Sequence, residues 1–167
     1  MPNSPSNTVS FPQSEGQTQR KQPFTYAEFE QIYSRVPRLT VDLVVMTEGG
    51  VVLVKRQEQS WHGMWHLPGG TVLYREKIED SVQRIAAEEL GLSVAIEKLL
   101  GYIEYPSELQ ERGFGYSVSL TFLCRADSSQ IDWLRWSEQE IQVFESVPEN
   151  TVVEQVEVLR GVLEGKV

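Results

Sequence analysis

The clearest hydrophobic pattern of the chain lies in the stretch "EDSVQRIAAEELG" and the isoleucine just before it. Ile78, Val82 and Ile85 are spaced i, i+4 and i+7, which places them on one side of an α-helix. The next position of this apolar stripe is Glu89, and a second glutamate, Glu88, stands beside it. The pattern predicts a helix over residues 77–90 that carries a carboxylate where a core residue is due.

Strand-like runs and short helical patterns account for most of the remaining chain. The predicted strands cover residues 39–46, 49–56, 93–105, 115–126 and 131–137, with a hairpin turn at Glu48-Gly49-Gly50 and a polar loop at 106–114. The other predicted helices cover residues 25–36, 137–144 and 148–165. Strands in separate pairs with helices between them predict an α+β fold built as a mixed α/β/α layer domain.

The N-terminal residues differ from the rest in composition. Residues 1–22 are rich in Ser, Pro, Gln and Asn, which bury little apolar surface, so this segment is predicted to be a flexible arm. The chain of 167 residues is 40% hydrophobic, which is enough for one sizeable core. Residues 23–167 are therefore expected to form a single domain.

The formal net charge of −9 narrows the classes of partner. It does not favour binding to nucleic acid or to anionic membranes, whereas a phosphorylated small molecule can still bind in one locally positive pocket. Cys124 is the only cysteine, so an internal disulfide is impossible, and its strand-like surroundings predict a buried thiol. The sequence has no apolar leader and no apolar run of about 20 residues, which predicts a cytoplasmic protein.

Glu89 needs a partner if the apolar stripe is buried, because an unpaired buried carboxylate is costly. Arg84 can pair with Glu88 at i+4, but no basic residue lies three or four positions before Glu89 or directly after it. Two explanations are open at this point. Either the helix is rotated so that Glu89 is solvated, or a bound divalent cation is coordinated by both carboxylates.

The spacing of the residues around this helix is typical of a known signature. The pattern is G-x5-E-x7-R-x3-E-E-x-G-L, formed by Gly70, Glu76, Arg84, Glu88, Glu89, Gly91 and Leu92. Residues 70–92 thus resemble the Nudix box of the Nudix hydrolase family, and the likeness extends from about Leu39 to about Ile141. The resemblance implies a Nudix-type α/β/α sandwich with a mixed β-sheet and a loop–helix motif.

The resemblance also implies roles for residues in and beside the box. Glu88 and Glu89 match the metal-binding carboxylates of the family, and the carbonyl of Gly69 matches a further ligand of Mg2+ or Mn2+. Glu76 and Arg84 match a pair that clamps the loop to the helix. The implied activity is hydrolysis of a nucleoside diphosphate linked to another group, with the metal helping to activate a water molecule.

One position departs from the box, because Ile85 stands where the family has a glutamate after the arginine. The GDP-mannose mannosyl hydrolases share this departure, which indicates a nucleotide sugar as substrate, and they are dimeric, which makes a homodimer possible. The residues matching Asp42 and Arg56 contact substrate in that subgroup, so Arg56 is either a catalytic phosphate partner or an exposed charge at a strand end. Tyr116 aligns with the catalytic histidine of the subgroup and Thr71 with its second catalytic arginine, which leaves the general base unassigned.

Further candidates come from the polar loop and from aromatic residues. Glu108 and Glu111 could each supply the missing base or an extra metal ligand, or could be solvated loop charges. Tyr105 could stack on a substrate nucleobase or pack in the core. Pro106 stands at a spacing after the box that resembles ADP-ribose-type Nudix enzymes, so an ADP-ribose-type pyrophosphatase is one alternative. A Nudix-fold module that binds such a ligand without hydrolysing it is the other.

Overall fold

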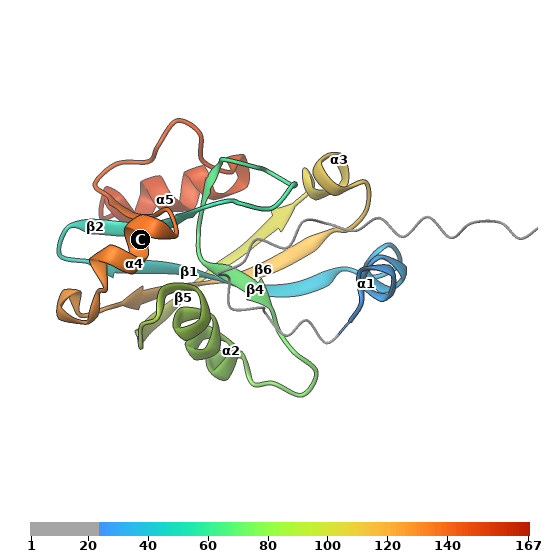
Figure 1. Ribbon diagram of the computed structural model, residues 1–167, viewed down its shortest axis with the longest axis horizontal. Coiled ribbons are helices and arrows are strands. Elements are labelled where there is room, and N and C mark those ends of the chain that lie inside the picture. The colour runs from blue at the N-terminus through green and yellow to red at the C-terminus, as the bar shows by residue number, and fades with distance from the viewer. Residues whose placement is uncertain (1–23) are drawn as a thin grey trace, which may run out of the picture.

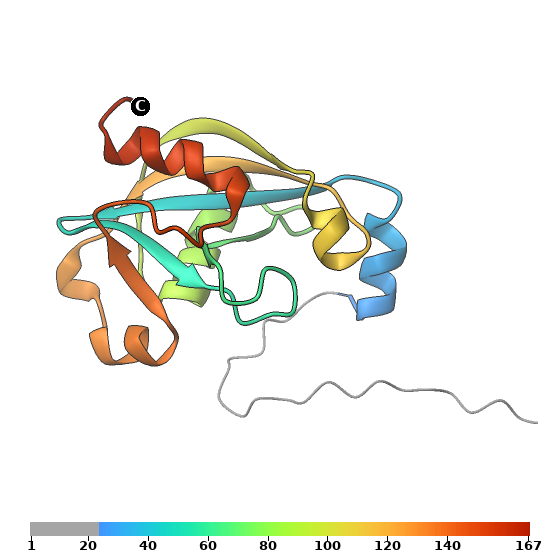
Figure 2. The same ribbon diagram turned by 90° about the horizontal axis from the view of Figure 1, so that it is seen from above.

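The computed structural model describes residues 24–167, and a mixed β-sheet forms its centre (Figure 1, Figure 2). Its strands are β1 (Arg38–Thr47), β2 (Gly50–Lys55), β3 (Trp65–His66), β4 (Gly69–Thr71), β5 (Ala95–Tyr105), β6 (Ser117–Arg125) and β7 (Ile141–Phe144). They are ordered β3-β2-β1-β6-β5, with β4 also paired to β1 and β7 to β2. The β1–β6 pair is parallel and the other pairs are antiparallel, so the predicted mixed sheet is confirmed.

Helices cover both faces of the sheet. They are α1 (Tyr26–Tyr33), α2 (Ile78–Ile85), α3 (Glu108–Arg112), α4 (Trp133–Glu138) and α5 (Val156–Leu163), with the 3-10 turns η2 (Ser128–Gln130) and η3 (Val153–Gln155). α2 and α5 lie on opposite faces, while α1 and α3 lie at one end of the sheet, which is the predicted α/β/α arrangement (Figure 1, Figure 2). Within residues 24–167, no helix combines the length and the apolar character needed to cross a lipid bilayer.

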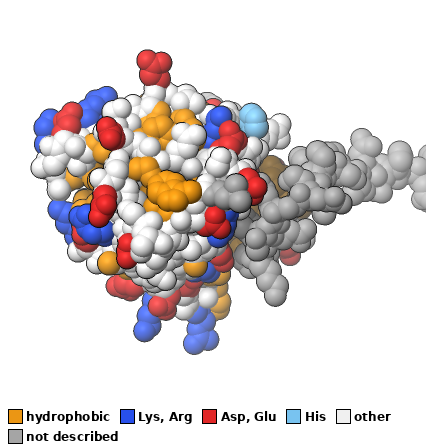
Figure 3. All heavy atoms as spheres, turned by 60° about the vertical axis from the view of Figure 1, so that its left-hand side comes forward, with side chains coloured by type: hydrophobic (Ala, Val, Ile, Leu, Met, Phe, Trp, Pro, Cys, Tyr) orange, Lys and Arg blue, Asp and Glu red, His pale blue; other side chains and the backbone are white. Residues whose placement is uncertain are grey.

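The surface on the side of α4 and β2 carries charges of both signs. Figure 3 shows acidic and basic side chains interspersed there, around a small group of hydrophobic side chains. The net charge of −9 is therefore not gathered into one acidic patch on this face.

Successive side chains of β1 point to opposite faces of the sheet. Val41 and Leu43 are fully buried and pack in the cluster that contains Val82 of α2. Val44 packs on the other face, in the cluster that contains Leu159 of α5. Asp42, which lies between Val41 and Leu43, therefore points away from α2, as do the other even-numbered residues of this strand.

The helix predicted over residues 77–90 forms, but its last turn is wider than an α-helical turn. α2 continues into a π-helical turn, η1 (Ala86–Leu90), in which the amide of Gly91 donates to the carbonyl of Ala86. Gly91 has a φ of 70° and ends the helix in the left-handed region that glycine tolerates. The indole of the buried Trp136 donates to the carbonyl of Leu90 at 2.9 Å, which satisfies the C-terminus of the helix.

Two predictions for the segment after β6 are wrong. Residues 131–137, predicted as a strand, contain α4, because Asp132 caps this helix by accepting from the amide of Arg135 at 3.1 Å. Residues 137–144, predicted as a helix, end in the strand β7, because Ile141–Phe144 pair with β2. Short apolar runs fit either period, so the tertiary pairing with β2 decides the structure here.

The other predicted elements form with shifted ends. The remaining four strand predictions are confirmed as β1, β2, β5 and β6. The helix predicted over 25–36 is the shorter α1, which begins with a capping box between Thr25 and Glu28. The helix predicted over 148–165 is limited to η3 and α5, and the predicted loop 106–114 contains α3. The predicted arm, residues 1–22, lies outside the described residues.

Candidate functional site

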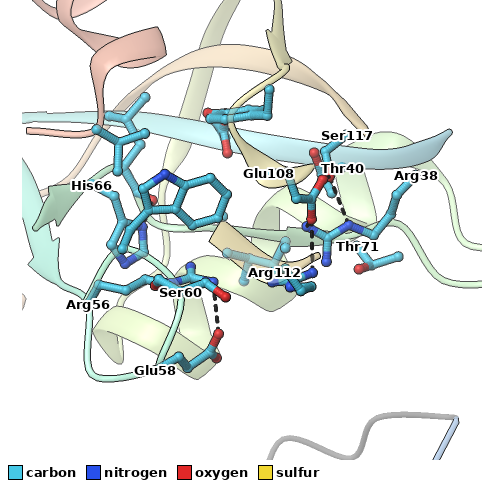
Figure 4. A pocket seen from close by; sticks show the side chains of 18 of the residues that line it. Arg38, Thr40, Arg56, Glu58, Ser60, His66, Thr71, Glu108, Arg112 and Ser117 are labelled. Carbon is cyan, nitrogen blue, oxygen red and sulfur yellow. Dashed lines mark hydrogen bonds and ion pairs between the residues drawn. The ribbon is translucent and has the colours of Figure 1, made fainter. Parts of the chain in front are cut away.

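A cleft of about 1680 Å3 lies between the sheet, α1 and the loop that precedes α2. Figure 4 shows part of it from close by. Its walls come from α1, β1, the segment 56–62, β4, α2 and α3, so residues far apart in the sequence meet there. The predicted site residues that line it are Asp42, Arg56, Gly69, Arg84, Glu88, Glu89, Tyr105, Glu108 and Glu111.

The two neighbouring glutamates of the helix line this cleft from the π-helical turn η1. Glu89 is partly buried, and one of its carboxylate oxygens accepts from the amide of Gly69 at 3.3 Å. Glu88 is more exposed and accepts from Nη1 of Arg84 at 3.2 Å. Glu89 therefore lies where the apolar stripe of α2 leaves the core and reaches the cleft.

The donors that this part of the cleft offers to a metal are oxygen atoms. Two carboxylates, those of Glu88 and Glu89, and the backbone of Gly69 form a set that suits hard cations such as Mg2+ and Mn2+. Over residues 24–167, no three His, Cys, Asp or Glu side chains form a metal-binding group. A third carboxylate is missing because position 85 of the helix is an isoleucine. Ile85 is 2% exposed and packs against Gly70, with its Cδ1 3.2 Å from where a Cβ of Gly70 would lie.

Glu76 and Arg84 form the predicted clamp between the loop and the helix. Nε of Arg84 donates to Oε1 of Glu76 at 2.6 Å and Nη2 donates to Oε2 at 2.8 Å, a bidentate pair. Nη2 also donates to the carbonyl of Thr71 at 3.0 Å. The hydrogen bonds of this pair lower the pKa of Glu76 and raise the pKa of Arg84, so both groups are held in their charged forms.

Arg84→Met is expected to lower the free energy of unfolding by about 1–3 kcal/mol, because Glu76 then keeps a partly buried charge without its cation. The loop should also open more often, which native-state digestion with trypsin would report as faster cleavage after Arg75. Arg160→Met, the same change on the exposed side of α5, is the control and should leave both quantities nearly unchanged. An Arg84→Met variant that is as stable and as resistant as the parent would show that the pair does not hold the loop.

Asp42 lies at the floor of the cleft in a buried chain of hydrogen bonds. The hydroxyl of Tyr105 donates to Asp42, and Nε2 of Gln155 donates to that hydroxyl at 2.8 Å. Burial raises the pKa of Asp42 to about 6, against the opposing effects of the Tyr105 hydrogen bond and of the positive charges of Arg38 and Arg56. Burial also raises the pKa of Tyr105, so its hydroxyl keeps its proton and remains a donor.

Asp42 is also adjacent to Gly69, because the two residues are paired between β1 and β4. A Cβ at position 69 would collide with Oδ1 of Asp42 and would lie 2.9 Å from the carbonyl oxygen of Val41. Only glycine fits here, and its lack of a side chain lets the Asp42 carboxylate lie directly beside the backbone of the loop.

Arg56 is oriented by contacts within its own segment. Its Nη2 lies 2.8 Å from Oε2 of Glu58, its Nε donates to the carbonyl of Ser60 at 3.3 Å, and its guanidinium carbon is 5.6 Å from the ring centroid of Trp61. The side chain of Arg56 is 19% exposed. It is therefore a partly buried cation of the cleft wall rather than an exposed charge at a strand end.

The sequence profile of the NUDIX domain family matches residues 36–162, which is more than half of the chain. The chain belongs to the NUDIX domain family. A solved structure, the MutT NUDIX hydrolase from Burkholderia pseudomallei, superposes on this Nudix chain with a TM-score of 0.59 and is 26% identical to it. The alignment covers 77% of this chain and 97% of that one. The predicted family and the predicted fold are thereby confirmed.

Two curated proteins are similar to this Nudix chain over part of its length. The low-salt glycan biosynthesis protein Agl8 of Haloferax volcanii is 46% identical over 78 residues, which covers 47% of this chain and 50% of the relative. The ADP-ribose pyrophosphatase of Methanocaldococcus jannaschii is 31% identical over 87 residues, which covers 52% of this chain and 50% of the relative. The chain thus spans about half the length of these relatives.

Tyr116 of this Nudix chain does not join the other candidates. The described lining of the cleft includes Ser117 but not Tyr116, because neighbouring residues of an extended segment point to opposite sides. Tyr116 is 39% exposed, and a hydrogen bond with Glu104 raises its pKa. The structure therefore does not place Tyr116 beside Asp42 or Glu89.

The two loop glutamates differ in their surroundings. Glu108 is 1% exposed, and its carboxylate accepts from Arg112 at 2.8 Å, from Arg38 at 3.0 Å and from Ser117 at 2.6 Å. It is a buried ion-paired group, so the expectation of a solvated loop charge is wrong for it. Glu111 is exposed at the rim of the cleft, where it accepts from the amide of Trp61 at 3.0 Å.

Several cleft residues carried no weight in the sequence-based prediction. Arg38 could have been found, because residues 38, 40 and 42 share one face of β1 and Asp42 was already a candidate. Arg112 and Gln155 had no comparable signal, since only the tertiary placement of α3 and η3 brings them to the cleft. The same is true of the aromatic side of α1, which contributes Phe29.

Proposed function

We propose that this chain is a Nudix hydrolase that uses Mg2+ or Mn2+ to hydrolyse a nucleoside diphosphate joined to a second group, such as the nucleotide sugar GDP-mannose. The observation that carries the proposal is the pair Glu88 and Glu89, which η1 presents to the cleft beside Gly69. Two adjacent carboxylates repel a diphosphate unless a cation lies between them. A module that only binds such a ligand gains nothing from this pair, so the pair favours an enzyme.

Glu88, Glu89 and the carbonyl of Gly69 are the groups that would hold the metal. When bound, a divalent cation neutralises the charge of the diphosphate and lowers the pKa of an attacking water molecule. The amide of Gly69 orients Glu89, and the Glu76–Arg84 clamp holds the loop that follows Gly69. The fold thus fixes the donor atoms before a substrate arrives, which is what electrostatic catalysis requires.

The rest of the proposed site recognises the substrate. Arg56 supplies a guanidinium to phosphate oxygens, for which the planar fork of arginine is well suited. Asp42 has acceptor capacity left for a hydroxyl or amino group of the substrate or for the attacking water, since Tyr105 occupies only part of it. Tyr105 acts through its hydroxyl, and its ring packs edge-on against Trp61 with a centroid distance of 6.4 Å.

The acceptor of the proton from water must lie outside the box, because Ile85 offers no carboxylate. Among the other carboxylates of the described cleft, Glu58 pairs with Arg56 at 2.8 Å, and Glu108 has its oxygens occupied by three donors. Glu111 lies at the rim, whereas Asp42 lies directly beside Gly69. We therefore assign proton transfer to Asp42 within this proposal.

A substrate panel tests the proposal. Nucleotide sugars including GDP-mannose, ADP-ribose, dinucleoside polyphosphates and deoxynucleoside triphosphates would be incubated with the protein and Mg2+ or Mn2+, with EDTA as the control. We expect metal-dependent turnover of at least one diphosphate-linked nucleoside. Tight binding of one compound without turnover of any would reject the hydrolase and support the binding module.

An ADP-ribose-type pyrophosphatase is a second candidate, and the similarity to the protein named ADP-ribose pyrophosphatase supports it. The name of the glycan biosynthesis relative is more consistent with a sugar-bearing substrate.

Hydrolysis in 18O-labelled water distinguishes attack of water at phosphorus from attack at the sugar carbon. Label in the phosphate product means attack at phosphorus, which yields a nucleoside monophosphate and a sugar phosphate. Label in the sugar means attack at carbon, which yields a nucleoside diphosphate and a free sugar.

A further inference from the structure

Two arginines share one buried carboxylate at the end of the cleft next to α1. Arg38 of β1 and Arg112 of α3 lie 3.0 Å and 2.8 Å from the same oxygen of Glu108. The side chains of the two arginines are 18% and 11% exposed, and that of Glu108 is 1% exposed. Two positive charges against one negative charge leave this group, the Arg38–Glu108–Arg112 triad, with a net positive charge.

The triad is held in a fixed geometry by its surroundings. The ring centroid of Phe29 lies 5.4 Å from the guanidinium carbon of each arginine, so one aromatic ring contacts both cations. Ser117 accepts from Nε of Arg38 at 3.0 Å and donates to Glu108 at 2.6 Å. The guanidinium groups therefore lose little freedom when a ligand binds to them.

Among the described residues, both arginines have N–H donors without a hydrogen-bond acceptor. Each guanidinium has five N–H donors, and within residues 24–167 Arg38 makes side-chain hydrogen bonds only to Ser117 and Glu108, and Arg112 only to Glu108. Both side chains line the cleft. Burial lowers the pKa of Arg38, so a negatively charged ligand at this position would also relieve the cost of its buried charge.

The triad forms a different wall of the cleft from Arg56. Its members come from β1 and α3, whereas Arg56 follows β2, and Figure 4 shows Arg38, Glu108 and Arg112 near Thr40 and Thr71. The two walls still interact electrostatically, since the charge of Arg56 helps to lower the pKa of Arg38. Arg38 precedes Asp42 by four residues on the same face of β1, which corresponds to about 13 Å between their backbone positions. The long side chain of Arg38 brings its positive charge close enough to lower the pKa of Asp42. A charged substituent on a group next to the diphosphate can therefore reach the triad.

We propose that Arg38 and Arg112 form a second anion-binding position, which binds a phosphate or carboxylate group that the substrate carries outside its diphosphate. The inference rests on the proposed function, because it places the diphosphate at Glu88, Glu89 and Arg56. A negatively charged substituent would offset the excess positive charge of the triad, which a neutral sugar or nucleoside would not. The inference therefore favours diphosphate-linked nucleosides with an additional negative charge over neutral ones such as GDP-mannose.

Two pairs of matched ligands test this inference and locate the charged group. UDP-glucose and UDP-glucuronate differ by a carboxylate on the sugar, and ADP-ribose and 2′-phospho-ADP-ribose differ by a phosphate on the nucleoside. Dissociation constants would be measured by calorimetry with Mg2+ present. We expect the charged member of one pair to bind at least about tenfold more tightly than its neutral partner, as a charge-assisted hydrogen bond predicts. The pair that shows the preference identifies the end of the substrate that reaches the triad.

Variants of Arg112 separate recognition from structural support. Arg112→Gln should abolish the preference for the charged ligand and change the affinity for the neutral one little, while Glu108 keeps its pair with Arg38. Arg112→Lys should restore part of the preference, because it returns the charge without the fork. Arg125→Gln is the control, since Arg125 is an exposed cation paired with Glu97 and does not line the described cleft. It should keep the full preference.

Three results would overturn the inference. The first is binding of the neutral ligands without any preference for the charged ones, which leaves the proposed function intact. The second is an Arg112→Gln variant that keeps the preference for charged ligands, whether or not its melting temperature is lower. The triad would then only stabilise the packing of α1 and α3. The third is no binding of any of the four ligands, which would count against this inference and the proposed function together.

Discussion

Glu89→Gln is expected to lower kcat/KM by roughly a hundredfold or more on any substrate that the panel identifies, because it removes one of the two carboxylates available to the metal. The neutral amide has the same shape, and its oxygen can still accept from the amide of Gly69. The fold should therefore persist while the affinity for Mg2+ falls. Steady-state kinetics over a range of Mg2+ concentrations, together with direct titration of Mn2+, would measure both effects.

Glu79→Gln is a matched control for this experiment. Glu79 lies in the first turn of α2, is exposed and does not line the described cleft. Its replacement removes the same charge from the same helix and should leave kcat/KM within about twofold of the parent value, as expected for a surface substitution. A Glu89→Gln variant with parental activity and parental metal affinity would show that the metal is bound elsewhere.

Asp42→Asn is expected to stabilise the fold at pH 8 and to impair turnover. Between pH 3.8 and about 6 the folded protein keeps the proton of Asp42 while the unfolded chain loses it, so the free energy of unfolding falls as pH rises through this window. A pKa raised from 3.8 to about 6 corresponds to a cost of about 3 kcal/mol above the window. Asparagine avoids this cost and still accepts from Tyr105.

Urea denaturation of both proteins at pH 4 and pH 8, in EDTA, measures this effect. The free energy of unfolding of Asp42→Asn should exceed that of the parent by up to about 3 kcal/mol at pH 8, and this difference should vanish toward pH 4. Its kcat should fall by about a hundredfold if Asp42 transfers the proton. Asp80→Asn, an exposed change in α2, should alter stability by no more than about 0.5 kcal/mol at either pH. Equal stability of Asp42→Asn and the parent at pH 8 would show that burying the charged Asp42 carboxylate does not destabilise the fold.

The box residues could be predicted from the sequence because their geometry is local. Glu76, Arg84, Glu88 and Glu89 lie on one loop and one helix, so fixed spacing along the chain determines which of them can meet. Gly69 joins them through the short strand β4, which directly precedes the loop. For the same reason the helix and its end at Gly91 were predicted nearly to the residue.

The remaining part of the site depends on contacts that the sequence does not encode locally. Arg38 and Glu108 are 70 residues apart, and they meet only because the parallel pairing of β1 with β6 brings the start of β1 next to Ser117 and α3. Because its partner Arg38 is so distant in the sequence, Glu108 was expected to be a solvated loop charge. The segment after β6 was ambiguous for a similar reason, since the strand β7 exists through its pairing with β2.

The π-helical turn η1 accommodates one residue that a regular α-helical turn would not hold. A π-helical turn holds one residue more than the α-helical turn it replaces, and an α-helix rotates by about 100° per residue. If the same residues formed a regular α-helix, Gly91 and the chain after it would be rotated by about that angle relative to α2. The hydrogen-bond pattern of this turn is therefore a part of the box that the acidic residues alone do not specify: a chain could keep Glu88 and Glu89 and still redirect the segment that follows them by losing the wide turn.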